Sequence, residues 1–262
     1  MRQALSGMFD YAMRRLPHLG IAFNPVRQVL PDLLQRKQTD VRKPTRFCAT
    51  VEQARAALAA IEARHRSWSP WMLLGHRFIA LTAVRKTEAF NATWDEFDLA
   101  EGLWVIPPAR MKMRLAHEVV LAPQAVEVLH AAHAIRRSKY VFPAPLKNAP
   151  MHRSDLNATM ARAFTYYVAD VVPISPHGWR RTFSTIMNER DFRDRVLIDR
   201  MLAHRAFEKV EQAYNKAQYL AERRRIASLW ADLLLAGAPS AAALIGLEPE
   251  RSNIVALRRA VA

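Results

Sequence analysis

The sequence lacks the features that mark disulfide-stabilised, secreted and membrane-spanning proteins. A single cysteine, Cys48, excludes an internal disulfide framework and a thiolate zinc cluster, and it fits a reducing compartment. No stretch approaches the roughly 20 uncharged apolar residues that a bilayer span requires, and the N-terminal residues lack the apolar core of a signal peptide. We therefore expect a cytoplasmic protein with no membrane segment.

Common cofactor and metal motifs are also missing. The chain has no GxxxxGK[ST] phosphate loop, no GxGxxG, no HExxH and no close cluster of aspartates for paired magnesium ions. His130 and His133 are three residues apart, but no cysteine or carboxylate with ligand spacing joins them. The sequence thus predicts no metal and no cofactor.

Positive charge is abundant. The 39 Lys and Arg residues against 24 Asp and Glu give a formal net charge of +15. This excess indicates a polyanionic partner, and nucleic acid is the first candidate because guanidinium groups pair bidentately with phosphate oxygens. A basic helical protein that binds RNA or the ribosome would show the same excess.

The apolar pattern predicts a mainly α protein with a small three-stranded antiparallel sheet, an α+β fold. Two short helices are expected before residue 37, where the apolar spacing is helical. Thr50 and Gln53 have the spacing of a capping box ahead of a helix. Further helices are expected at 71–84, 124–137, 155–168, from 175, at 196–202 and at 219–235, and short strands at 93–99, 103–108 and 117–122.

The segment TAVRKTEAF places Arg85 and Glu88 three residues apart, after a nearly all-apolar helix. Residues at this spacing share a helix face, so a surface ion pair is one interpretation. An arginine that emerges from the core instead needs partners, and Glu88 is positioned to orient it.

The segment SPHGWRRTFST predicts a helix that begins at Ser175-Pro176, with His177 and Arg180 on one face of its first turn. A helix N-terminus attracts anions, and an imidazole and a guanidinium beside it would suit a phosphate. An ordinary capped amphipathic helix with exposed basic residues explains the segment equally well in isolation.

A third segment, LAHRAFEKVEQAYNK, contains His204 and Tyr214. In order, the chain thus carries RxxE, a basic turn within MKMRLAHEVVL, HxxR, and a histidine followed by a tyrosine. Over roughly residues 45–235 this ordered set resembles the tyrosine recombinases of the phage and genomic-island integrase group. The resemblance implies six catalytic residues, with Glu88 in support: Arg85, Lys112, His177, Arg180, His204 and Tyr214.

The resemblance also implies the chemistry. Tyr214 would attack a DNA phosphodiester to form a 3′-phosphotyrosyl intermediate and a free 5′-hydroxyl, without metal or ATP, and the same site would then rejoin strands. Arg85 and Arg180 would grip the non-bridging oxygens, and Lys112 would protonate the leaving 5′-oxygen. His177 would assist proton transfer, and His204 would hydrogen-bond the phosphate.

Domain organisation follows the same comparison. Residues 1–40 resemble the last helices of a core DNA-binding domain with a linker, 41–236 the catalytic domain, and 237–262 a tail that could dock on a neighbouring protomer. By this comparison the core-binding domain is truncated, and AH replaces the usual GH before His204. The implied partners are double-stranded DNA at attachment sites and further copies of the chain in a tetramer, in the cytoplasm at the nucleoid of a bacterium.

Alternatives to a recombinase remain open at this stage. The chain could be a catalytically weak or inactive DNA-binding module of the same fold, a basic RNA-binding protein, or an enzyme with activity like that of a type IB topoisomerase. Within AYNKAQYLAERRR, helical phase assigns Tyr219 to the core stripe with Ile226 and Trp230, and the arginines 223–225 to a solvated or phosphate-facing surface.

Overall fold

The computed structural model describes residues 2–28, 46–63, 68–111, 114–144, 149–150, 171, 174–203 and 219–247. The chain divides into two compact units, Met1–Thr45 and Arg46–Ala262, which are treated separately below. None of the helices within the described residues is both long and apolar enough to cross a membrane.

The first unit is a small helical hairpin. It consists of α1 (Arg2–Arg15), the 3-10 turn η1 (Pro17–Leu19) and α2 (Pro25–Gln28). The buried side chain of Asn24 holds the hairpin together, because its Nδ2 donates to Asp10 Oδ1 at 2.8 Å and to the Ser6 carbonyl at 2.9 Å. Two helices are therefore present where the sequence predicted them.

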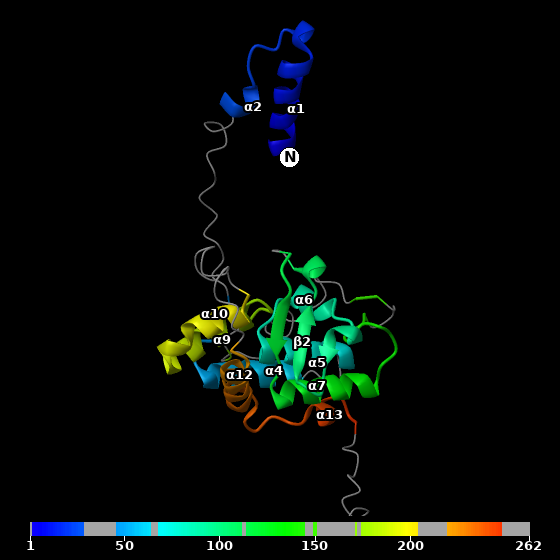
Figure 1. The fold of residues 1–262 in the computed structure, drawn as a ribbon, viewed down its shortest axis with the longest axis vertical. Coiled ribbons are helices and arrows are strands. Elements are labelled where there is room, and N and C mark those ends of the chain that lie inside the picture. The colour runs from blue at the N-terminus through cyan, green and yellow to red at the C-terminus, as the bar shows by residue number, and fades with distance from the viewer. Residues whose placement is uncertain are drawn as a thin grey trace, which may run out of the picture. The chain divides into compact units, whose positions relative to one another are not determined.

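The second unit is mainly helical, with one small sheet (Figure 1). Its α-helices are α4 (Val51–Glu62), α5 (Pro70–Thr82), α6 (Lys86–Phe90), α7 (Pro123–Ala134), α9 (Gly178–Arg190), α10 (Arg195–Met201), α12 (Leu220–Leu235) and α13 (Ala241–Leu244). The 3-10 turns are η2 (Trp94–Glu96), η3 (Pro108–Arg110) and η4 (Phe192–Asp194). The predicted fold class is confirmed.

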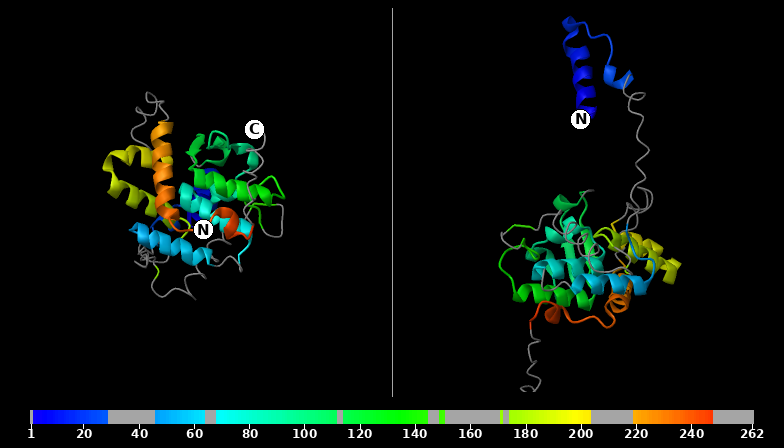
Figure 2. Two further views of the ribbon diagram at one scale, coloured as in Figure 1. Left: turned by 90° about the horizontal axis from the view of Figure 1, so that it is seen from below. Right: turned by 180° about the vertical axis from the view of Figure 1, so that it is seen from behind.

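Helix α5 is the centre of the core. Ser69 caps it by accepting from the Met72 amide at 3.3 Å, and every residue from Met72 to Thr82 is buried. Helices α4, α7, α9 and α12 all pack against α5, and Figure 2 shows this group of helices from two further sides. The Trp230 indole of α12 donates to the Ala80 carbonyl at 2.9 Å, which fixes α12 on this central helix.

The sheet has the order β1-β2-β3 and is antiparallel throughout, with β1 at Phe97–Asp98, β2 at Leu103–Ile106 and β3 at His117–Val120. Along β2 the residues alternate in burial, with Trp104 and Ile106 buried and Val105 exposed. Trp104 stacks on Phe97 at 5.1 Å between ring centroids. The three expected strands are thus confirmed, although each is shorter than its apolar run.

The predicted Thr50 cap at the start of α4 is present, but the reciprocal contact of Gln53 goes to the residue before the N-cap and not to Thr50 itself. The Gln53 amide donates to Thr50 Oγ1 at 3.3 Å, and the Gln53 side chain accepts from the Ala49 amide at 2.9 Å. The helix expected at 155–168 lies outside the described residues. Within the expected tail, α13 packs on α7, and the Ala241 amide donates to Glu127 Oε1 at 2.7 Å.

Two expectations about the start of α12 are wrong. Tyr219 is 40% exposed, because the helix begins at Leu220 and Tyr219 is the N-cap residue with a left-handed backbone (φ 49°). The side-chain direction of Tyr219 cannot be calculated from the helical repeat, because this residue lies outside the helix. Arg223 is not at the surface but 1% exposed, and its guanidinium donates to the Glu118 carbonyl of β3.

Candidate active site

Arg85 and Glu88 form the first part of the candidate site. Arg85 is the N-cap residue of α6, three residues after the end of α5. The Glu88 carboxylate accepts from the Arg85 amide at 2.8 Å and from its guanidinium Nη1 at 2.7 Å. Glu88 is 6% exposed and Arg85 is 35% exposed, so a buried carboxylate orients a guanidinium that still reaches solvent.

Arg180 is the second guanidinium, in the first turn of α9. It is buried, and its Nη1 donates to the Ala83 carbonyl at 2.6 Å while its Nη2 donates to the Leu202 carbonyl. Burial, followed by the charge of Arg85, lowers the pKa of Arg180 to about 10, and the charge of Glu88 opposes the shift. Arg180 therefore stays protonated at neutral pH, in electrostatic contact with Arg85 and Glu88.

The backbone links the two arginines. Ala83, whose carbonyl accepts from Arg180, lies two residues before Arg85 and has a left-handed backbone (φ 52°) that ends α5. Because this αL residue turns the chain out of the helix, one turn of backbone holds Arg180 through its carbonyl and continues directly into Arg85.

His177 lies at the start of α9 with an exposed side chain. The sequence had predicted His177 in the first turn of this helix. The helix instead begins at Gly178, and His177 is its N-cap residue. Ser175 still caps this end, since its Oγ accepts from the Gly178 amide at 3.0 Å. A side chain at Gly178 would not fit, because a Cβ there would lie 2.0 Å from the Arg46 carbonyl oxygen.

Buried contacts fix α9 in place behind the site. The Trp179 indole donates to His76 Nε2 of α5 at 2.9 Å, and both residues are fully buried. Burial, with a smaller effect of the Arg77 charge, lowers the pKa of His76 to about 3, so this imidazole is a neutral acceptor. The Thr182 hydroxyl accepts from the Cys48 amide at 2.9 Å.

The hairpin between β2 and β3 contributes a structural arginine. Arg110 pairs with Glu96 and also donates to the Glu88 carbonyl, so its charge is engaged in holding the base of the hairpin against α6. Arg110 lies two residues before Lys112, the predicted general acid. Lys112, His204 and Tyr214 themselves lie outside the described residues.

His117 is a neighbour of the site that no sequence motif indicated. It is the first residue of β3, and its Nε2 lies 3.2 Å from the Met201 carbonyl at the end of α10. The charges of Glu88, Arg223 and Arg180 all act on its pKa, which burial lowers to about 4. Its position directly after a basic turn was the only signal in the sequence.

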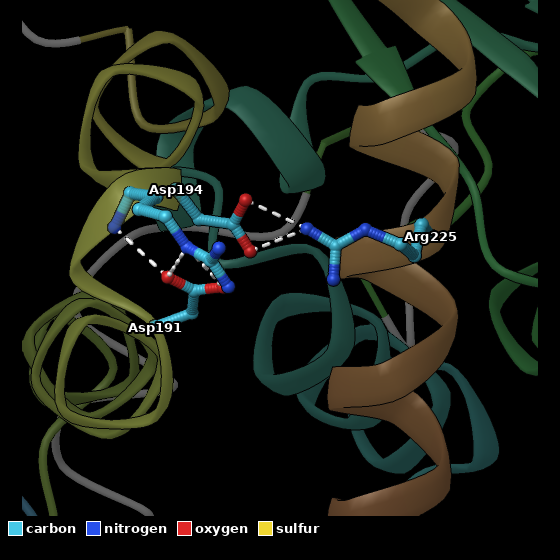
Figure 3. A network of polar contacts seen from close by, with 4 residues as sticks. Asp191, Asp194 and Arg225 are labelled. Atoms are coloured by element: carbon cyan, nitrogen blue, oxygen red, sulfur yellow. Dashed lines mark hydrogen bonds and ion pairs between the residues drawn. The ribbon is translucent and has the colours of Figure 1, made fainter.

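An ion pair joins the elements on either side of residues 204–218. Arg225 of α12 donates to both oxygens of Asp194, at 2.6 and 2.5 Å, and Asp194 immediately precedes α10 (Figure 3). Asp191, beside Asp194, accepts from the guanidinium of Arg193 at 2.8 Å. Helices α10 and α12, between which His204 and Tyr214 lie in the sequence, are therefore held together by this contact and by their packing.

Comparison with known proteins gives relatives that are integrases of phages and prophages. Prophage integrase IntA of Escherichia coli K12 is 38% identical over 158 residues, which are 60% of this chain and 37% of that protein. The integrase of Shigella phage Sf6 is 30% identical over 168 residues, which are 62% of this chain and 41% of that protein. The chain thus matches about two fifths of the length of these curated relatives.

The fold has a counterpart among solved structures. A lambda integrase(75-356) dimer bound to a COC′ core site matches with a TM-score of 0.54 and 16% identity, over 79% of this chain and 73% of that one. Residues 49–220 match the Phage integrase family, which is well over half of the chain. With the fold of a tyrosine recombinase catalytic domain and this match, the chain belongs to the Phage integrase family.

Proposed function

We propose that the chain is a site-specific DNA recombinase that cleaves and rejoins strands through a covalent 3′-phosphotyrosyl intermediate, without metal or ATP. The observation that carries this proposal is the junction at Ala83 and Arg85, where one turn of backbone holds the buried Arg180 and presents the partly exposed Arg85. Two oriented guanidinium groups at one place suit a phosphodiester.

The two guanidiniums would stabilise the transition state. Negative charge accumulates on the non-bridging oxygens of a phosphodiester under attack, and preorganised donors that need no reorganisation lower the barrier most. Glu88 orients Arg85 through two contacts, and two backbone carbonyls orient Arg180. Arg180 keeps its charge at neutral pH, since its lowered pKa is still about 10.

In the proposed cleavage step, the phenol oxygen of Tyr214 forms a bond to phosphorus and the bond from phosphorus to the 5′-oxygen breaks. The phenol proton leaves with help from His177, and Lys112 donates a proton to the departing 5′-oxygen. His204 would hydrogen-bond the phosphate. Attack of a 5′-hydroxyl from another strand on the phosphotyrosine reverses these steps and reseals DNA.

Double-stranded DNA at attachment sites is the proposed substrate. The formal charge of +15 predicts binding that weakens steeply with salt. The lambda integrase structure with the similar fold is named as a dimer bound to a COC′ core site. For this chain we propose assembly to a tetramer on DNA, in the bacterial cytoplasm at the nucleoid.

The domain limits are part of the same proposal. Residues 1–40 would be the end of a core-binding domain, residues 41–236 the catalytic domain, and residues 237–262 a segment for docking between protomers. The α1–α2 hairpin and the helices around α5 support the first two assignments.

A covalent-trapping assay tests the function. Duplexes that cover the junctions of the mobile element encoding this chain are each nicked close to a candidate site, so that the cleaved end diffuses away. A recombinase gives an SDS-stable protein–DNA adduct in the presence of EDTA, and Arg180→Lys greatly reduces it. Salt-dependent DNA binding with no adduct on any duplex would point to a DNA-binding module, and tighter binding to RNA would point to an RNA-binding protein.

A further inference from the structure

The C-terminal end of α10 is held by side chains from two other elements. Its Met201 carbonyl accepts from His117 of β3, and the next carbonyl, Leu202, accepts from Arg180 of α9. The last carbonyls of a helix have no partners within it and form the negative end of the helix dipole, so donors there stabilise the turn. Ala203, with a left-handed backbone (φ 46°), then leads the chain out of the helix.

The contact with a carbonyl oxygen determines which ring nitrogen of His117 carries a hydrogen. A carbonyl oxygen only accepts, so Nε2 of His117 must carry the hydrogen. The charges of Glu88 of α6, Arg223 of α12 and Arg180 of α9 all act on this ring. With a pKa held at about 4 by burial, His117 donates as a neutral group and places no additional positive charge beside Arg180 and Arg223.

The position of His117 connects three parts of the proposed site. It is the first residue after the basic hairpin and pairs with Ile106 of β2 in the sheet. The charge of Glu88, which orients Arg85, acts on its ring. Its contact with Met201 reaches the turn after which His204 follows in the sequence. A shift of this turn would move the Leu202 carbonyl and hence Arg180.

We propose that His117 is a positioning residue for DNA strand cleavage, which fixes the C-terminal turn of α10 against β3 so that Arg180 keeps its orientation toward the phosphate. This inference rests on the proposed recombinase function. In this role His117 would act through the Met201 carbonyl and not by direct contact with the phosphate. Misplacement of a catalytic group by about 1 Å can cost on the order of 100-fold in rate.

The test compares His117→Phe, which removes the donor, with His117→Gln, which keeps an N–H donor. His130→Phe is the matched control, since His130 is an exposed histidine on α7. We expect His117→Phe to lower the single-turnover cleavage rate on the nicked duplexes by about 10- to 100-fold with DNA affinity unchanged. We expect His117→Gln to recover much of that loss and His130→Phe to match wild type.

Amide hydrogen exchange supplies a readout that does not depend on cleavage. The Leu202 amide donates to the Ile198 carbonyl and the Ala203 amide to the Arg200 carbonyl, both at 3.0 Å, so these amides report on the turn. In His117→Phe they should exchange faster, and in His117→Gln near the wild-type rate. Thermal unfolding of each variant shows whether the change is confined to this turn.

The outcomes separate the two proposals. If wild type forms no adduct, the recombinase function is overturned, and hydrogen exchange still decides whether His117 holds the turn. If wild type cleaves and a folded His117→Phe cleaves equally fast, the positioning role is wrong. Equal loss in His117→Phe and His117→Gln, with unchanged exchange, would also overturn it.

Discussion

Replacement of Glu88 by glutamine probes the orientation of Arg85 with little change in shape. The Glu88 carboxylate accepts at 2.8 Å from the Arg85 amide and at 2.7 Å from its guanidinium, one contact to each oxygen. Glutamine has a single accepting oxygen, so Glu88→Gln retains at most one of these contacts and removes the charge. We expect the guanidinium to lose its fixed orientation.

The magnitude follows from the contact that is lost. A hydrogen bond between charged groups contributes about 1.5–3 kcal/mol. If the transition state for cleavage loses all of this free energy, the cleavage rate falls by about 10- to 150-fold, since each 1.36 kcal/mol in the barrier changes the rate tenfold. DNA affinity should change much less, because Arg85 is one of 39 Lys and Arg residues that could contribute to the proposed binding of DNA.

Single-turnover cleavage of the nicked duplexes measures this effect. Glu101→Gln is the matched control, because Glu101 is 70% exposed and its oxygen lies 3.7 Å from Arg224. Surface pairs of this kind contribute about 0–1 kcal/mol. Wild-type cleavage by Glu88→Gln, with a rate indistinguishable from Glu101→Gln, would refute the orienting role of Glu88.

Three further predictions concern the scaffold. The pKa of His76 is about 3 in the folded protein, below its ordinary value of 6.5, so only the unfolded chain binds a proton at His76 as the pH falls below about 6.5. The free energy of unfolding should therefore decline by about 2 kcal/mol between pH 7 and 5. Urea unfolding of His76→Phe should depend less on pH, and an unchanged pH dependence would contradict the assignment. Arg77 is 1% exposed and donates to both Glu62 oxygens at 2.6 Å. Glu62→Ala leaves this buried guanidinium without its counter-charge and should lower the free energy of unfolding in urea by about 3–5 kcal/mol. A loss below about 1 kcal/mol would be inconsistent with a buried pair. Gly178→Ala would place a Cβ 2.0 Å from the Arg46 carbonyl oxygen and should lower the free energy of unfolding by about 1–3 kcal/mol. An unchanged denaturation midpoint would contradict this, because it would show that the start of α9 can shift freely.

The sequence predicted the elements well where local chemistry decides them. Thr50 and Ser69 are caps that act within a single turn, and α5 is buried on nearly every side because its residues are apolar on nearly every side. The pairing of Arg85 with Glu88 was likewise accessible, since a spacing of three residues at the start of a helix brings these side chains together.

Tertiary structure decided what the sequence could not. Tyr219 was assigned to the core from its helical phase, but its left-handed backbone places it ahead of α12 and exposed. Arg223 looked like its charged neighbours, yet it faces β3 and is buried. His117 approaches Met201 only because β3 and α10 pack together, a contact between residues far apart in the chain.

The exposed position of Tyr219 sharpens the test of the nucleophile, because two tyrosines five residues apart now compete for that role. The decisive measurement is to digest the trapped adduct with protease and nuclease and to locate the nucleotide-bearing tyrosine by mass spectrometry, with Tyr214→Phe and Tyr219→Phe in parallel. We predict a 3′-phosphate on Tyr214, no adduct from Tyr214→Phe, and an adduct from Tyr219→Phe. A nucleotide on Tyr219, or an undiminished adduct from Tyr214→Phe, would contradict it.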